Sequence, residues 1–212
     1  MTPRIQRDDA RPRAVSRGRA YVYVAPCRFE DILKLGFSRD PLDRFQTLHR
    51  RYYEFFDLDR ALLIELDSVK EARGIEQRLG SGIIAHSAPA PLIIPPGAAG
   101  HTEWYRGAYD VLAGGGVADC LREGHTVHVP VAPWLRHRLL QQGDRLYGWC
   151  DQMLDAIGQH GGDNSPAVPL APLERTLVDA LDAYAALDIP LAPLVTPRIL
   201  NWHATARRRS RA

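Results

Sequence analysis

The chain has 212 residues, of which 45% are apolar and 25% are charged, and its formal net charge is +2 at pH 7. This balance is typical of a globular protein with a packed core, and the length suits one large domain or two small ones. No apolar run approaches the roughly 18 residues that span a bilayer. So small a net charge does not by itself indicate a nucleic-acid partner.

Arginine is concentrated at both ends of the chain. It is frequent over residues 1–18, predicted to be a flexible basic arm, and over 201–212, predicted to be a basic tail. Such charge runs can hold phosphates electrostatically. Only Lys34 and Lys70 are lysines, so the arginine bias runs through the whole sequence and is also consistent with genome composition. Both explanations stay open.

An antiparallel hairpin and a helix are predicted near the N-terminus. Side chains alternate between two faces over 20–25 and over 32–37, which predicts two strands joined by a short turn. Asp40 followed by Pro41 is a good helix start, and apolar residues recur at helical spacing behind it. A third strand is predicted over 60–66.

A second helix and a hinge complete the first half. Ser68 to Glu71 forms a capping box at the start of this helix, and the glycine at position 80 favours an early end to it. A loop rich in proline and glycine is predicted over 89–100, and a short helix over 103–112. The three glycines at 114–116 read as a hinge and predict a domain boundary.

The predicted fold class is α/β (α+β). A small three-stranded antiparallel or mixed sheet flanked by helices is expected in a domain over 19–114. A mainly helical domain of unknown role is expected over 117–200. Within that second domain the patterns predict a strand over 126–131, a helix over 133–158 and another over 173–187.

Four side chains with complementary chemistry stand on the predicted elements of the first half. Tyr23 and Lys34 lie on the two hairpin strands, and Arg44 and Glu76 lie on the two helices. Phosphodiester cleavage needs an activated water, cations that neutralise the phosphate and stabilisation of the leaving oxygen. One glutamate with several waters is a typical Mg²⁺ arrangement, because this ion dehydrates reluctantly. The set therefore suits phosphodiester chemistry with a single divalent metal.

The order of these residues resembles the GIY-YIG nuclease superfamily, in its phage-type branch (T5orf172 or Mug113-like). The resemblance covers only the first half of the chain. The matching segments are, in order, Tyr21-Val22-Tyr23, Lys34-Leu35-Gly36, the arginine of DPLDRFQTL, the glutamate of EARGIEQRL and Glu103-Trp104-Tyr105.

The resemblance implies an endonuclease that hydrolyses DNA with one Mg²⁺ or Mn²⁺ ion. Glu76 would bind the metal, which lowers the pKa of its water and holds the leaving group. Arg44 would grip a non-bridging phosphate oxygen, and Lys34 would supply positive charge beside it. Tyr23 would orient or deprotonate the attacking water. Tyr21 faces the same way as Tyr23 and stays an alternative to it.

Further residues are expected around this group. His49, just past the helix arginine, is a candidate auxiliary catalytic group. The predicted substrate-binding residues are Gly36, Ser38, Arg39 and Trp104.

Two departures from the family pattern motivate alternatives. Lys34 replaces the tyrosine of the second signature, although lysine is usual there in the phage-type branch. Gly80 stands where that branch often has a histidine. One alternative is a catalytically weak or inactive nucleic-acid-binding module with the same fold. Another is an interaction protein that acts through its C-terminal half, by way of a protein partner or an oligomer.

The cysteines and the N-terminus indicate a compartment. Cys27, Cys120 and Cys150 lie far apart with no CxxC pair, which predicts free thiols in a reducing environment and no zinc site. The N-terminus lacks the apolar stretch of a secretory signal. A cytoplasmic protein without membrane association is therefore expected.

Overall fold

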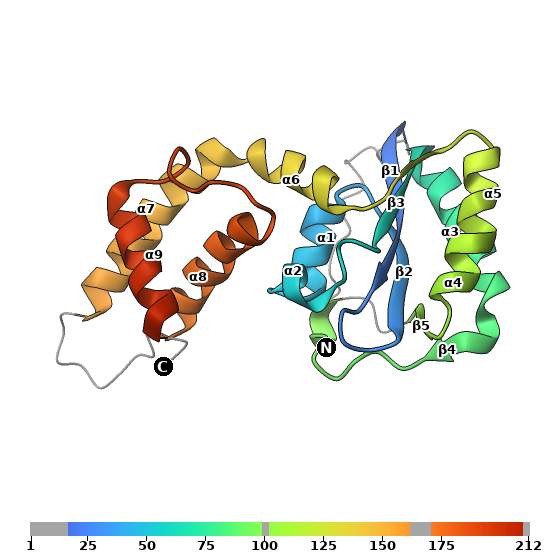
Figure 1. Cartoon of the computed structure of the whole chain (residues 1–212), viewed down its shortest axis with the longest axis horizontal. Helices are drawn as coiled ribbons and strands as arrows, with labels where there is room; N and C mark the ends of the chain where they lie inside the picture. Colours follow the sequence, from blue (N-terminus) through green and yellow to red (C-terminus); the bar gives the residue numbers. More distant parts are fainter. Residues whose placement is uncertain (1–16, 99–101, 162–170, 210–212) are drawn as a thin grey trace, which may run out of the picture.

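The chain forms a sheet with helices on both faces, followed by a C-terminal helical bundle (Figure 1). The structure is a computed structural model that describes residues 17–98, 102–161 and 171–209. Residues 1–16 of the predicted basic arm and 210–212 of the predicted tail lie outside these ranges. No helix of the described part is long and apolar enough to cross a bilayer.

The sheet has six strands in the order β4-β5-β2-β1-β3-β6, and every pairing in it is antiparallel. The α+β class and the N-terminal hairpin are thereby confirmed. The predicted three-stranded sheet is wrong, because short strands extend both edges of its three central ones. The strands are β1 (Arg17–Pro26), β2 (Ile32–Ser38), β3 (Leu62–Ser68), β4 (Ser87–Ala88), β5 (Trp104–Arg106) and β6 (Thr126–His128).

Strand β5 stands where the sequence predicts the start of a helix. It pairs with the beginning of β2, and α4 (Tyr109–Val111) begins only after it. Glu103 and Gly107 flank the strand with φ values of 59° and 64°, which interrupt helical geometry on both sides. A strand of three residues carries no periodicity of its own, so the neighbouring strand decides its conformation.

Strand β6 lies beyond the triple glycine and still belongs to the sheet, where it pairs with β3. The glycines form a π-helical turn, Leu112–Gly116, which leads directly into α5 (Val117–Arg122). The predicted boundary between residues 114 and 117 therefore falls within a run of helical turns. The sheet continues on its far side.

Both predicted helix starts in the first half are confirmed. The Asp40 carboxylate accepts a hydrogen bond from the Asp43 amide at 3.3 Å, at the start of α1 (Pro41–Leu48). The Ser68 hydroxyl accepts one from the Glu71 amide at 3.2 Å, at the start of α3. Helix α3 (Val69–Gly82) runs through Gly80, so the early end predicted there does not occur.

The alternation along β1 separates two cores. Tyr21 and Tyr23 belong to the core beneath α1 and α2 (Tyr52–Phe55), whereas Val22 and Val24 belong to the core beneath α3. Figure 1 shows α1 and α2 on one face of the sheet and α3, α4 and α5 on the other. The first core continues into the C-terminal helices, so the two parts of the chain share apolar packing.

The C-terminal bundle differs from its prediction in two places. The single helix predicted over 133–158 is two helices that break at Gln141 and Gln142. Residues 201–209 of the predicted basic tail are helical, because α9 packs on the bundle through one face, on which Ile199 and His203 are buried. The helices are α6 (Ala132–Leu140), α7 (Gly143–Gly161), α8 (Ala171–Ala186) and α9 (Pro197–Arg209).

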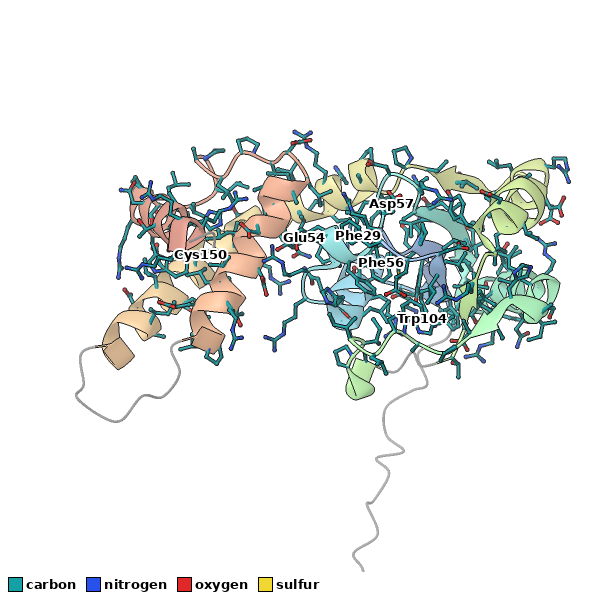
Figure 2. All side chains as sticks on the ribbon, turned by 60° about the horizontal axis from the view of Figure 1, so that its bottom comes forward. Phe29, Glu54, Phe56, Asp57, Trp104 and Cys150 are labelled. Atoms are coloured by element: carbon teal, nitrogen blue, oxygen red, sulfur yellow. The ribbon has the colours of Figure 1, made fainter. Side chains whose placement is uncertain are left out.

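The three cysteines are free and buried, as the sequence predicts. Cys150 lies on α7 among the side chains of the bundle, which Figure 2 shows together with Trp104 at the sheet. Burial raises the pKa of the Cys150 thiol to about 12. The thiol is therefore protonated at neutral pH and packs as a small apolar group.

Candidate active site

Tyr23 and Gly36 face each other across β1 and β2. A Cβ atom added to Gly36 would lie 2.3 Å from the hydroxyl oxygen of Tyr23, well inside van der Waals contact. Only a residue without a side chain lets the phenol cross the neighbouring strand at this point. Gly36 therefore positions Tyr23, while its predicted contact with substrate stays a prediction.

Arg44 joins this pair from the first helix. Its Nε donates a hydrogen bond to the Tyr23 hydroxyl at 3.2 Å, and its Nη1 donates one to the Ala98 carbonyl at 2.6 Å. Burial raises the pKa of Tyr23, although the charge and hydrogen bond of Arg44 oppose that shift. Tyr23 is therefore a neutral phenol at neutral pH, so it is better suited to orient a water than to deprotonate one.

Lys34 is buried on the same face of the sheet, with 1% of its side chain exposed. Its Nζ donates to the Thr102 carbonyl at 2.7 Å and to the Glu103 carboxylate at 2.9 Å. It lies 5.9 Å from the ring centroid of Trp104, which is itself 1% exposed. Trp104, predicted to bind substrate, is thus buried, and its ring packs against the Lys34 ammonium.

Glu103 is a member of this site that sequence reasoning missed. The residue stands directly before Trp104 in a segment that the family resemblance includes, and a carboxylate beside a predicted site tryptophan was the available signal. Its φ of 59° is unusual for a residue with a side chain. Burial would raise the pKa of Glu103, but its hydrogen bonds with Lys34 and Thr102 lower the pKa overall.

Glu76 approaches the cluster from α3. Burial and the charge of Glu103 raise the pKa of Glu76, whereas Lys34, Arg73 and a backbone hydrogen bond from Phe37 lower it less. The Glu76 charge in turn acts on the pKa values of Tyr23 and Lys34. The structure therefore brings the four predicted residues, Tyr23, Lys34, Arg44 and Glu76, into one electrostatic neighbourhood.

Glu76 and Glu103 are the residues of the cluster that could take part in holding a divalent cation. Glu76 and Glu103 are neighbouring carboxylates whose repulsion a cation would offset, and carboxylate oxygens are ligands that Mg²⁺ prefers. Within the described residues, no group of three or more histidines, cysteines or acidic residues could hold a metal. An ion at Glu76 would therefore keep water as most of its ligands.

Tyr105 fills the space that Gly80 leaves open. A Cβ atom on Gly80 would meet the Tyr105 hydroxyl at 3.0 Å. Burial raises the pKa of Tyr105, and the charges of Glu103 and Glu76 raise it further. A second neutral phenol thus lies on the Glu76 side of the site. Sequence reasoning missed this residue, because nothing local links it to position 80.

Two predicted catalytic residues lie outside this cluster. The ring of Tyr21 packs edge-on against Trp134, with 5.2 Å between centroids. His49 stacks on Phe55 at 4.6 Å, and burial lowers its pKa. Both rings are thus engaged in aromatic packing.

The other two predicted substrate contacts lie at the turn between β2 and α1. The Ser38 hydroxyl donates to the Asp40 carbonyl at 2.9 Å and accepts from the Asp40 amide at 3.0 Å, so it stabilises the turn. Arg39 is exposed there. Its predicted contact with phosphate stays a prediction.

The chain was compared with models of protein families, with curated proteins and with solved structures, and none of them matches it. The family resemblance therefore stays a prediction from the residues. The functional assignment depends on the geometry of the cluster.

Proposed function

We propose that this protein is a metal-dependent endonuclease of the GIY-YIG type that hydrolyses DNA phosphodiester bonds. The observation that carries the proposal is the hydrogen bond of 3.2 Å between Tyr23 and Arg44, formed over Gly36 and beside the charges of Lys34 and Glu76. Two strands and two helices deliver these groups to one place. Their chemistry matches the requirements of phosphodiester cleavage.

Each side chain has a role that follows from its environment. Tyr23 is a neutral phenol that orients a water for attack, and Arg44 holds both the phenol and a phosphate oxygen. Lys34 places a buried positive charge behind the phosphate. Glu76 would hold Mg²⁺ or Mn²⁺, which on binding would supply a water of lowered pKa and charge stabilisation at the leaving oxygen.

A nucleic-acid-binding module without turnover is the second candidate. The observation that favours it is the burial of Lys34, whose ammonium already donates to Thr102 and Glu103 and is 1% exposed. A phosphate would have to displace one of these acceptors to contact the lysine. DNA binding that weakens steeply with salt, without cleavage, would support this candidate.

The deciding experiment is a cleavage assay on supercoiled plasmid with Mg²⁺ or Mn²⁺, and with EDTA as the control. The proposed nuclease converts the plasmid to nicked circles only when metal is present. Absence of nicking with either metal, at protein concentrations that bind the plasmid, would favour the binding module. Absence of both binding and nicking would leave an interaction protein as the remaining candidate function.

Tyr23→Phe is expected to lower the nicking rate by about 100-fold, the scale of the loss when a reacting group is no longer held in position. The change removes the hydroxyl that accepts from Arg44 and leaves the ring in the core. Initial rates on plasmid measure the effect, and circular dichroism checks the fold. Tyr21→Phe is the matched comparison, and a larger loss in that variant would make Tyr21 the tyrosine of the first signature.

The metal requirement is expected to depend on pH through Glu76. Because its pKa is raised above the ordinary value of 4.5, a proton competes with the metal at higher pH than for an exposed glutamate. The Mg²⁺ concentration for half-maximal nicking should therefore rise as pH falls through that raised pKa. Glu103→Gln removes one cause of the shift and should move the rise to lower pH. An identical profile in this variant would contradict the assignment.

A further inference from the structure

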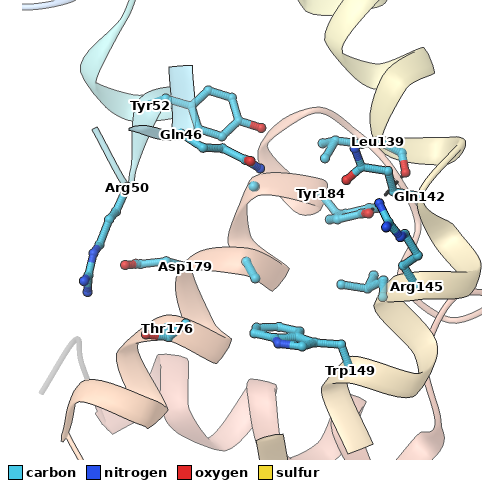
Figure 3. A pocket seen from close by; sticks show the side chains of 13 residues that line it. Gln46, Arg50, Tyr52, Leu139, Gln142, Arg145, Trp149, Thr176, Asp179 and Tyr184 are labelled. Atoms are coloured by element: carbon cyan, nitrogen blue, oxygen red, sulfur yellow. Dashed lines mark hydrogen bonds between the residues drawn. The ribbon is translucent and has the colours of Figure 1, made fainter. Parts of the chain in front are cut away.

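A cleft of about 470 Å³ lies where the sheet part meets the helical bundle. Figure 3 shows its walls, which come from α1 and α2 on one side and from α6, α7 and α8 on the other. This volume is within the range of about 300–1,000 Å³ that is usual for small-molecule sites. None of the residues proposed for DNA cleavage lines it.

Tyr52 brings an unsatisfied hydroxyl to this cleft. Tyr52 is 1% exposed, and its oxygen has no hydrogen-bond partner among the residues that the structure describes. Figure 3 shows the hydroxyl pointing toward the interior of the cleft. Buried polar groups are nearly always hydrogen-bonded, so a buried hydroxyl without a partner at a cleft wall points to a ligand that supplies one.

The remaining groups of the cleft are those that recognise a flat polar ring. The amides of Gln46 and Gln142 extend into it from opposite walls, and the indole of Trp149 reaches into it from α7 (Figure 3). Each amide offers both a donor and an acceptor, which matches the edge of a nucleobase. Aromatic side chains such as Trp149 stack on bases of any sequence.

Arg145 supplies the cleft with a positive charge that can bind an anionic group. Arg145 lies on the same wall as Gln142, and guanidinium groups hold phosphates with paired hydrogen bonds (Figure 3). Asp179, the acidic residue of the lining, accepts a hydrogen bond of 2.7 Å from Arg51, which also donates to Glu54. The hydroxyl of Tyr184 donates a hydrogen bond to the Leu139 carbonyl at 3.1 Å, so Tyr184 forms part of the cleft wall.

We propose that the cleft binds one nucleotide. The base stacks on Trp149, the hydroxyl of Tyr52 and the amide of Gln46 bond its edge, and Arg145 holds its phosphate. The nucleotide is either a free one or an unstacked base of a nucleic-acid strand. The proposal does not depend on the cleavage activity, since none of its residues belongs to the proposed nuclease site.

The test is isothermal titration calorimetry of the full chain with the nucleoside 5′-monophosphates. EDTA in the buffer keeps metal-dependent cleavage out of the measurement, so a failure here says nothing about the nuclease. Saturable binding of at least one monophosphate, with ribose 5-phosphate much weaker, is expected for a free nucleotide. Binding of a single-stranded DNA tetramer alone would assign the base to a strand. Binding of neither would overturn the proposal.

Variants locate the binding in this cleft. Trp149→Leu should weaken it by about ten- to hundredfold, and Tyr52→Phe by about three- to tenfold. Tyr52→Phe removes no internal hydrogen bond, so it keeps the fold even if Trp149→Leu does not. Tyr53→Phe is the matched control, because the buried Tyr53 hydroxyl also has no partner within the described part of the chain and the residue lines another cavity. Wild-type affinity in Tyr52→Phe would overturn the proposal.

Discussion

Replacement of Glu76 by alanine is expected to abolish metal-dependent nicking, with a loss of about 100-fold or more in rate. A bound metal contributes several kcal/mol of charge stabilisation, and about 1.4 kcal/mol corresponds to a factor of ten. Glu76 is the carboxylate that α3 brings beside Tyr23 and Lys34. Time courses of plasmid nicking over a range of Mg²⁺ concentrations measure the effect.

Loss of folding does not explain such a result. The raised pKa of Glu76 means that the fold disfavours its charged form, so removal of the carboxylate at neutral pH does not weaken the fold through that charge. Glu71→Gln is the matched control on the same helix, at the capping box rather than at the site. It should nick within twofold of the wild type. Retention of full activity by Glu76→Ala would contradict the assignment of Glu76 as the metal ligand.

Gly36→Ala is the second large effect that the structure predicts. The added methyl group would lie 2.3 Å from the Tyr23 hydroxyl oxygen. The ring of Phe45 packs against the Tyr23 ring, with 5.6 Å between centroids, and hinders its displacement. Overpacking of this kind costs about 1–3 kcal/mol of folding free energy. The same displacement separates Tyr23 from Arg44. Urea unfolding should show the loss of stability, and plasmid nicking should fall with it.

Gly74→Ala is the matched control for that substitution. Gly74 lies inside α3, and a Cβ atom added there would meet nothing within 4 Å. Alanine should raise the free energy of unfolding by about 0.5–1 kcal/mol, since glycine is disfavoured in helix interiors. If Gly36→Ala were as stable as Gly74→Ala, the close approach of Tyr23 to β2 would be refuted.

The parts of the fold that the sequence predicted depend on contacts between near neighbours. The caps at Asp40 and Ser68 each accept a hydrogen bond from an amide three residues away, so the helix starts could be read directly. The alternation along β1 correctly placed Tyr21 and Tyr23 on one face. The alternation could not say which of them meets Arg44, because Trp134 covers Tyr21 from a distant helix.

The rest of the candidate site required the folded chain. Lys34 and Glu103 are 69 positions apart, and their pairing exists because β5 is hydrogen-bonded to β2. The cleft needs Tyr52 from one part of the chain and Trp149 from the other. No local pattern encodes either proximity.

Composition, periodicity and capping residues were enough to predict the α+β class, the three central strands and the helix starts. They also singled out the four residues of the proposed catalytic group, whose role stays a prediction. The six-stranded sheet, the pairing of Lys34 with Glu103 and the stacking of His49 on Phe55 could be seen only in the folded chain. This division follows from the range over which the interactions act. Capping and periodicity operate within a few residues along the chain, whereas edge pairing and burial depend on which distant segments compete for the same apolar face.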